Sequence, residues 1–165
     1  MLDLEKMALD LVSLEAQLLD RQEWTEWLNL YAETARIWIP MWKDDSTLTA
    51  DPDTELSFMY LENKDYLRER VNRISSGLSV ALTPVPRVCH IVGRGHVVID
   101  PKTRDASVKS SWMSNVYHHK DNALTHYAGH YEHTLELVDD RYQISLKKVV
   151  VINDRLQSQV EFYYF

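Results

Sequence analysis

The chain has 165 residues, a net charge of −7, 45% hydrophobic residues and 26% charged residues. This length predicts a single domain, residues 1–165, with an ordinary globular composition. The negative charge gives no support to nucleic-acid binding, no apolar run is long enough to span a membrane, and the acidic start is unlike a secretory signal. The single cysteine, Cys89, excludes an internal disulfide framework, so we expect a cytoplasmic protein.

Two helices are predicted at the start of the chain. Apolar residues from Leu4 to Leu18 recur at spacings of three and four, which places them on one helical face, and Asp3 is the expected N-cap. Asp20, with Glu23 three residues later, resembles a capping box that begins a second helix rich in tryptophan.

The next segments alternate between regular and irregular structure. Residues 35–42 alternate in the manner of a strand, and Pro40 predicts an edge or a bulge there. Residues 43–62 are acidic and are expected to form a long surface loop, whereas 64–74 have the periodicity of a third helix.

The chain beyond Gly77 has the pattern of strands and turns. The predicted strands are residues 88–99 (with a bulge at Gly93 and Gly95), 106–118, 124–138 and 142–152. Their short polar connections favour antiparallel hairpins. Helices followed by strands predict an α+β fold, in which a curved, mostly antiparallel sheet wraps around the N-terminal helices.

Five histidines in the second half raise the question of a metal site: His118, His119, His126, His130 and His133. His126 and His130 have ligand spacing for a helix, but on a strand they lie roughly 13 Å apart. His133 falls on the opposite face of the same strand. We therefore do not expect this group to hold a metal.

An acid–base pocket is the second chemical possibility. Asp20, Tyr31, His90 and His130 are the side chains that a cavity of this fold would use, but we favour the simpler interpretation, in which Asp20 caps a helix and Tyr31 fills the core. The chain has no glycine-rich phosphate loop, no C-x-x-C and no G-x-S-x-G. Cys89 is expected to be inert packing in an apolar strand.

Several motifs occur in a characteristic order. W-x-P-x-W-x-D, L-T-x-D-P, E-x-S and L-x-x-R-x-x-R lie within residues 38–73, and T-P-x-P-R-x-x-H, Y-x-G-x-Y and K-K-V-x-V-x-N-D follow within residues 83–154. Together they resemble the small (beta) subunit of aromatic-ring-hydroxylating dioxygenases, in particular the benzoate, toluate and anthranilate 1,2-dioxygenase branch.

The resemblance implies a fold, partners and a function. The fold would be a cone-shaped α+β barrel similar to nuclear transport factor 2 and scytalone dehydratase. The chain would be a non-catalytic structural subunit without cofactors of its own. Its partner, a large (alpha) subunit, would carry a Rieske [2Fe–2S] cluster and mononuclear Fe(II), receive electrons from NADH through a reductase, and dihydroxylate an aromatic carboxylic acid. The assembly would be an α3β3 hexamer containing a β trimer.

Aromatic and arginine side chains contribute much of the binding energy in protein interfaces. Together with the resemblance, this predicts that several of them lie at subunit contacts. The candidates are Trp42, Arg70, Arg73, Arg87, Phe162 and Tyr164. For the aromatic tail, residues 162–165, closing the domain's own barrel is a nearly equal alternative. For the whole chain, a stand-alone lyase or isomerase and a small-ligand-binding module remain open.

Overall fold

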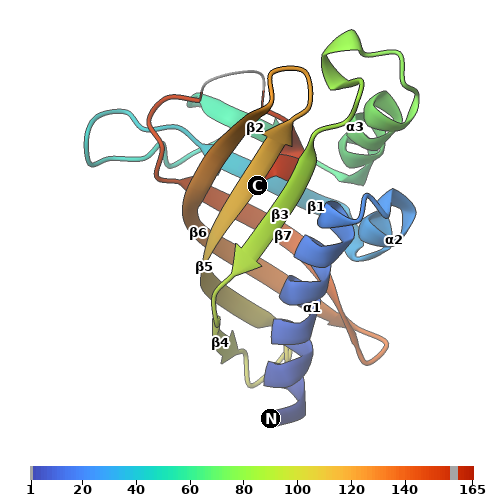
Figure 1. Ribbon diagram of the computed structural model, residues 1–165. Coiled ribbons are helices and arrows are strands. Elements are labelled where there is room, and N and C mark those ends of the chain that lie inside the picture. Colours follow the sequence, from blue (N-terminus) through green and yellow to red (C-terminus); the bar gives the residue numbers. More distant parts are fainter. Residues whose placement is uncertain (1, 157–159) are drawn as a thin grey trace.

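The computed structural model describes residues 2–156 and 160–165, which form a strongly curved sheet with helices along its concave side (Figure 1). In chain order the elements are α1 (Leu2–Asp20), α2 (Trp24–Asn29), β1 (Tyr31–Pro40), β2 (Ser57–Leu61), α3 (Lys64–Ser75), η1 (Val80–Leu82), β3 (Arg87–Val92), β4 (His96–Ile99), β5 (Ala106–His118), β6 (Ala123–Val138), β7 (Arg141–Val151) and η2 (Phe162–Tyr164).

The sheet has the strand order β2-β1-β7-β6-β5-β3, and β4 also pairs with β5. All pairs are antiparallel except β1 with β7, which is parallel. The path ends at β2 and at β3, so the described strands form an open cone and not a closed barrel. The expected α+β class and the mostly antiparallel sheet are confirmed. The long strands β5 and β6 accumulate right-handed twist, which curls the sheet around the helices.

The concave face carries the core. Along β5 the buried residues alternate with exposed ones from Ala106 to Val116, as a half-buried strand requires. Helix α1 lies against β3, β4, β5 and β7 on this side. The predicted face of α1 is confirmed in part: Leu18 is buried and Leu4, Met7 and Leu11 pack against the core. The most deeply buried positions also include Ala8, Val12 and Leu19, whereas Leu14 is 41% exposed.

Four local predictions were wrong. Asp3 lies inside α1, and α2 has Glu23 as its N-cap residue, without a side-chain capping bond. Residues 57–61 do not form a loop but strand β2, which pairs antiparallel with β1. The two strands are far apart in the sequence, so local patterns do not reveal the pairing. The predicted strand at 88–99 is two strands, β3 and β4, separated by Gly93–Gly95.

Other predictions are confirmed. Helix α3 buries Leu67, Val71 and Ile74, and its N-cap Asn63 accepts hydrogen bonds from two main-chain N–H groups of the first turn. Pro40 lies at a register shift between β1 and β2. None of the described helices combines the length and apolarity needed to cross a bilayer.

The end of the chain folds into the cone. Phe162, Tyr163, Tyr164 and Phe165 are each no more than 3% exposed. The C mark in Figure 1 accordingly lies within the curve of the sheet. This tail, residues 162–165, is therefore part of the core.

Candidate functional site

A buried polar centre joins four elements inside the cone. The carboxylate of Glu15, on α1, accepts hydrogen bonds from Trp27 Nε1 of α2 at 2.7 Å and from the Tyr31 hydroxyl of β1 at 2.8 Å. Lys147 Nζ, on β7, lies 3.0 Å from each oxygen of the same carboxylate. Neither Glu15 nor Lys147 is more than 2% exposed. This ion pair fixes α1 and α2 to the sheet.

The charge states in this centre follow from burial and pairing. Burial disfavours the charge on Glu15, but the Lys147 ammonium and the hydrogen bond from Trp27 outweigh it and hold the pKa of Glu15 below its ordinary value. Burial likewise lowers the pKa of Lys147, and the Glu15 carboxylate opposes that change. Burial, followed by the Glu15 charge, raises the pKa of the Tyr31 hydroxyl well above its usual range. Tyr31 is therefore a neutral donor to an ionised Glu15.

His133 borders this centre and is neutral. It faces the interior of β6, directly opposite Lys147 on β7. Burial first, and then the neighbouring ammonium, lower the pKa of His133 to about 3. Both of its ring nitrogens lack a hydrogen-bond partner among the described residues, as does the hydroxyl of Tyr131 beside it. The ammonium of Lys147 lies 4.8 Å from the centre of the Tyr131 ring.

The aromatic tail contacts the same centre. Lys147 Nζ donates to the main-chain oxygen of Phe165 at 2.8 Å, and the Ser114 hydroxyl donates to that of Tyr164 at 2.6 Å. The Phe165 ring meets Trp112 and Tyr127 edge-to-face, at centroid distances of 5.9 and 5.1 Å. The tail thus completes both the polar and the aromatic part of the core.

The residues of the predicted acid–base pocket do not assemble. Asp20 and His90 do meet, because the Asp20 carboxylate accepts from the His90 main-chain N–H at 2.9 Å and lies 2.6 Å from its Nδ1. This contact ties the end of α1 to β3. Tyr31 instead belongs to the Glu15 centre, and His130 is exposed on the opposite face of the sheet.

The histidines are dispersed as the strand geometry predicted. His126 and His130 are exposed on the outer face of β6, whereas His133 is buried on the inner face. His126 Nδ1 lies 2.7 Å from the Asn115 side-chain oxygen. Within residues 2–156 and 160–165, no group of three or more His, Cys, Asp or Glu side chains is placed to hold a metal. Cys89 is exposed, which contradicts its prediction as a buried residue, because it occupies an outward position of β3.

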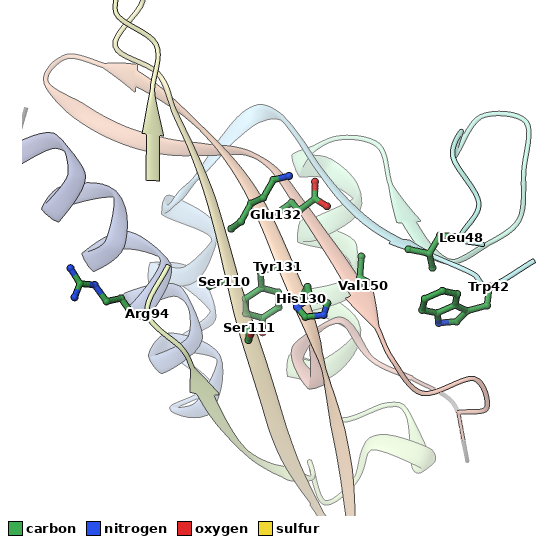
Figure 2. Close-up of a pocket in the computed structure, with 10 residues that line it drawn as sticks. Trp42, Leu48, Arg94, Ser110, Ser111, His130, Tyr131, Glu132 and Val150 are labelled. Carbon is green, nitrogen blue, oxygen red and sulfur yellow. The ribbon is translucent and has the colours of Figure 1, made fainter. Parts of the chain in front are cut away.

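The convex face of the sheet carries two adjoining hollows. The first, of about 540 Å³, lies beneath the loop that bears Trp42 and Leu48 and extends across β6 towards Arg94 (Figure 2). The second, of about 390 Å³, is mainly apolar. A cross-strand row lines it, formed by Ile91, Met113, Ala128 and Ile152. Three of these side chains, Ile91, Met113 and Ile152, are 40–59% exposed.

The six candidate interface residues divide into two sets. Arg73 and Arg87 are exposed, and Arg70 and Trp42 are partly exposed. Trp42 Nε1 donates to the Val151 main-chain oxygen at 2.8 Å, which holds its loop on the sheet. Phe162 and Tyr164 are covered by the chain itself, in accord with the alternative that the tail closes its own domain.

Comparison with known proteins places this architecture in a family. The model of the ring hydroxylating beta subunit family matches residues 14–158. The chain belongs to this family. It is 34% identical to the 2-halobenzoate 1,2-dioxygenase small subunit of Burkholderia cepacia, over 99% of both chains. It matches the benzoate 1,2-dioxygenase beta subunit of Burkholderia mallei with a TM-score of 0.76 and 26% identity, over 94% of this chain and 93% of that one.

A scytalone dehydratase-like chain from Novosphingobium aromaticivorans shares the fold. Its TM-score is 0.68 at 13% identity, over 92% of this chain and 88% of that chain. The expected cone-shaped α+β fold is confirmed by this match and by the family members. As a beta subunit, the chain is part of an oxidoreductase and has no recognisable catalytic site among its described residues.

Sequence reasoning missed the Glu15–Lys147 pair. Glu15 lies three residues after Val12 and four before Leu19, and so belongs to the buried face of α1. Lys147 shares the inward parity of Val149 and Val151 on β7. The available signal was that each of these charged residues occupies a position on the apolar face of its helix or strand.

Proposed function

We propose that this chain is the structural beta subunit of a cytoplasmic dioxygenase that adds both atoms of O₂ to an aromatic carboxylic acid of the benzoate or anthranilate type. The observation that carries the proposal is the 34% identity with the 2-halobenzoate 1,2-dioxygenase small subunit across 99% of both chains. The relation to a benzoate 1,2-dioxygenase beta subunit supports the same substrate class. The domain, residues 1–165, acts by supporting a large subunit.

The iron chemistry belongs to that partner in this proposal. The residues of this chain do not fit a Rieske cluster, which takes two cysteines and two histidines, because Cys89 is the single cysteine. They do not fit mononuclear iron either, since His126 and His130 lie on the outer face of β6 and His133 on the inner face. The [2Fe–2S] cluster, the mononuclear Fe(II) and the electrons from NADH are therefore assigned to the alpha subunit and its reductase.

The proposed assembly is an α3β3 hexamer that contains a β trimer. Its contacts use Trp42, Arg70, Arg73 and Arg87, which retain accessible surface in the folded chain. Phe162 and Tyr164 are buried, so in this proposal they affect assembly indirectly, by maintaining the shape of the cone that presents the contact residues.

Co-expression with the large subunit tests the function. The purified complex should contain iron and acid-labile sulfide and should consume O₂ with benzoate or a substituted benzoate, whereas this chain alone should hold no stoichiometric iron. About one tightly bound iron per isolated chain, or turnover by the large subunit that is unchanged when this chain is absent, would contradict the proposal.

A charge reversal tests the interface. Arg87 is exposed on β3 and lies 6.0 Å from the centre of the Tyr117 ring. We expect Arg87→Glu to lower the yield of complex at least about tenfold, since a charge placed against its partner costs several kcal/mol. Lys102→Glu, an equal charge change at an exposed turn, is the matched control. Sizing chromatography measures assembly, and the thermal unfolding of each isolated subunit should match the parent.

A further inference from the structure

Two segments of this acidic chain carry charge of a single sign. The acidic loop, residues 44–56, contains five carboxylates and no lysine or arginine. The basic segment, residues 73–87, contains Arg73 and Arg87 and no aspartate or glutamate. Each segment therefore presents a local field of one sign, and the two fields are opposite.

The same two segments carry the most exposed large apolar side chains among the described residues. Leu78 and Val80, in the basic segment, are 86% and 79% exposed, and Leu56, at the end of the acidic loop, is 76% exposed. The next in order, Ile152, is 59% exposed. Exposed apolar side chains rimmed by charged residues mark a contact surface, and an apolar centre with a polar rim is the usual anatomy of a protein interface.

The basic segment has a fixed shape. Lys120 Nζ, on the turn between β5 and β6, donates to the Val80 main-chain oxygen at 2.6 Å, and the Thr83 hydroxyl donates to another main-chain oxygen of the segment at 2.9 Å. Leu82 is buried and anchors η1 to the core. Leu78 and Val80 are thus presented to solvent by an ordered main chain, which lowers the entropy lost when a partner binds.

The acidic loop is ordered in a similar way. Its Glu55 carboxylate pairs with Lys43 and accepts from the Asp51 main-chain N–H at 2.9 Å. The side chains of Asp45 and Asp53 are exposed and form no ion pair within the described part of the chain. The same is true of both arginines of the basic segment. Both surfaces therefore keep charges available for a partner.

The two surfaces lie on different sides of the fold. In Figure 1 the acidic loop, in cyan, extends to the left of the sheet, whereas the basic segment, in bright green, follows α3 at the upper right. A contact between them joins unlike patches of two copies. Contacts of this head-to-tail kind generate closed rings when the rotation between copies allows closure.

We propose that the basic segment of one copy docks on the acidic loop of a second copy, and that this head-to-tail contact closes the β trimer. Leu78 and Val80 pack against Leu56 of the second copy, and Arg73 and Arg87 face the carboxylates of its acidic loop. The trimer itself rests on the function proposed above, and the two surfaces identify the parts of the chain that build it.

An exchange of charges tests the contact because it predicts a rescue. The segment variant combines Arg73→Asp with Arg87→Asp, the loop variant combines Asp45→Arg with Asp53→Arg, and the exchange variant carries all four changes. Analytical ultracentrifugation of the complete chain gives the dissociation constant of the trimer. The segment and loop variants should each weaken the trimer at least about tenfold, because like charges then face each other. The exchange variant should return to within about threefold of the parent.

Two further variants separate the contact from the fold. Lys102→Asp with Arg141→Asp makes the same change in net charge at exposed positions outside both surfaces, and should leave the trimer unchanged. Leu78→Ser with Val80→Ser removes the apolar centre and should weaken the trimer at least about tenfold. Thermal unfolding below the dissociation constant of the trimer should match the parent for this variant, since both side chains are largely exposed.

Three outcomes would overturn the proposal: the parent chain stays monomeric, the exchange variant is no stronger than the segment and loop variants, or the trimer is insensitive to Leu78→Ser with Val80→Ser. Variants that reduce binding of the large subunit but leave the trimer intact would make the large subunit the occupant, and the proposal would be wrong. The function proposed above is decided separately, by turnover of the parent complex. Turnover in a complex whose trimer does not depend on these residues would leave that function standing.

Discussion

Replacing Lys147 with Met should destabilise the isolated subunit strongly. Methionine matches the length of the lysine stem, so the main loss is the ammonium that lies 3.0 Å from both oxygens of Glu15 and 2.8 Å from the Phe165 oxygen. The Glu15 carboxylate is 0% exposed and cannot recruit water without opening the core. It keeps only the donors of Trp27 and Tyr31.

The magnitude follows from the unpaired charge. Removing one partner of a buried ion pair costs about 3–5 kcal/mol in the free energy of unfolding, because the remaining charge stays desolvated. Glu15→Gln retains an oxygen acceptor for Trp27 and Tyr31 and removes the charge. The double variant, Glu15→Gln with Lys147→Met, should therefore lie within about 2 kcal/mol of the parent. A coupling energy of at least about 2 kcal/mol between the two sites is expected.

Urea unfolding of the parent, the two single variants and the double variant measures this cycle, with the m-value checked for constancy. Lys109→Met is the matched control, because Lys109 is exposed on the outer side of β5 and its loss should change stability by no more than about 0.5 kcal/mol. A cost below about 1 kcal/mol for Lys147→Met, or a double variant as unstable as the sum of the singles, would refute the reasoning.

Three further outcomes are expected. Gly129→Ala should destabilise the subunit by about 3 kcal/mol or more in urea unfolding, because an added Cβ would lie 1.8 Å from a main-chain oxygen of β7. A loss of stability below about 1 kcal/mol would show instead that β6 and β7 can move apart easily. Gln at His126 or His130 should leave the turnover and iron content of the assembled enzyme unchanged, and a normally assembled variant with turnover lowered by orders of magnitude would contradict this. NMR titration should give Glu55 a pKa of about 2, because the Lys43 side chain and two main-chain N–H groups stabilise its carboxylate. The resulting stability is present above the unfolded pKa near 4.5 and is lost as pH falls through about 2. An ordinary pKa for Glu55 would show that these hydrogen bonds do not persist in solution.

Local periodicity was enough for much of this fold. β5 matches its predicted range, residues 106–118, because one of its faces is buried along most of its length and the alternation is uninterrupted. The third helix was found for the same reason. Strand β2 was missed because its pairing with β1, for example Tyr60 with Trp38, joins segments separated by an acidic loop. Pairing of that kind joins segments that are distant in the sequence, and the local pattern of residues 57–61 does not reveal it.

The buried face of α1 shows a different limit. The spacing of Leu4, Leu11 and Leu18 selected a leucine stripe. Leu18 is buried, but the most deeply buried positions also include Ala8 and Glu15, which are 0% exposed. Alanine and glutamate do not stand out as core residues in a hydrophobic pattern, and α1 contacts β3, β4, β5 and β7. Hydrophobicity alone therefore does not identify these two positions as buried.

The location of the charges explains why this chain serves as a scaffold. Catalysis needs a titratable group that can reach a substrate. In this chain the buried carboxylate and ammonium neutralise one another, His133 is held neutral by burial, and Phe165 fills the space beside them. The accessible features lie outside: an apolar row on the convex face and exposed arginines on α3 and β3. An interior closed in this way, combined with an exterior rich in contact residues, is what a subunit requires if its contribution is to hold a catalytic partner in place.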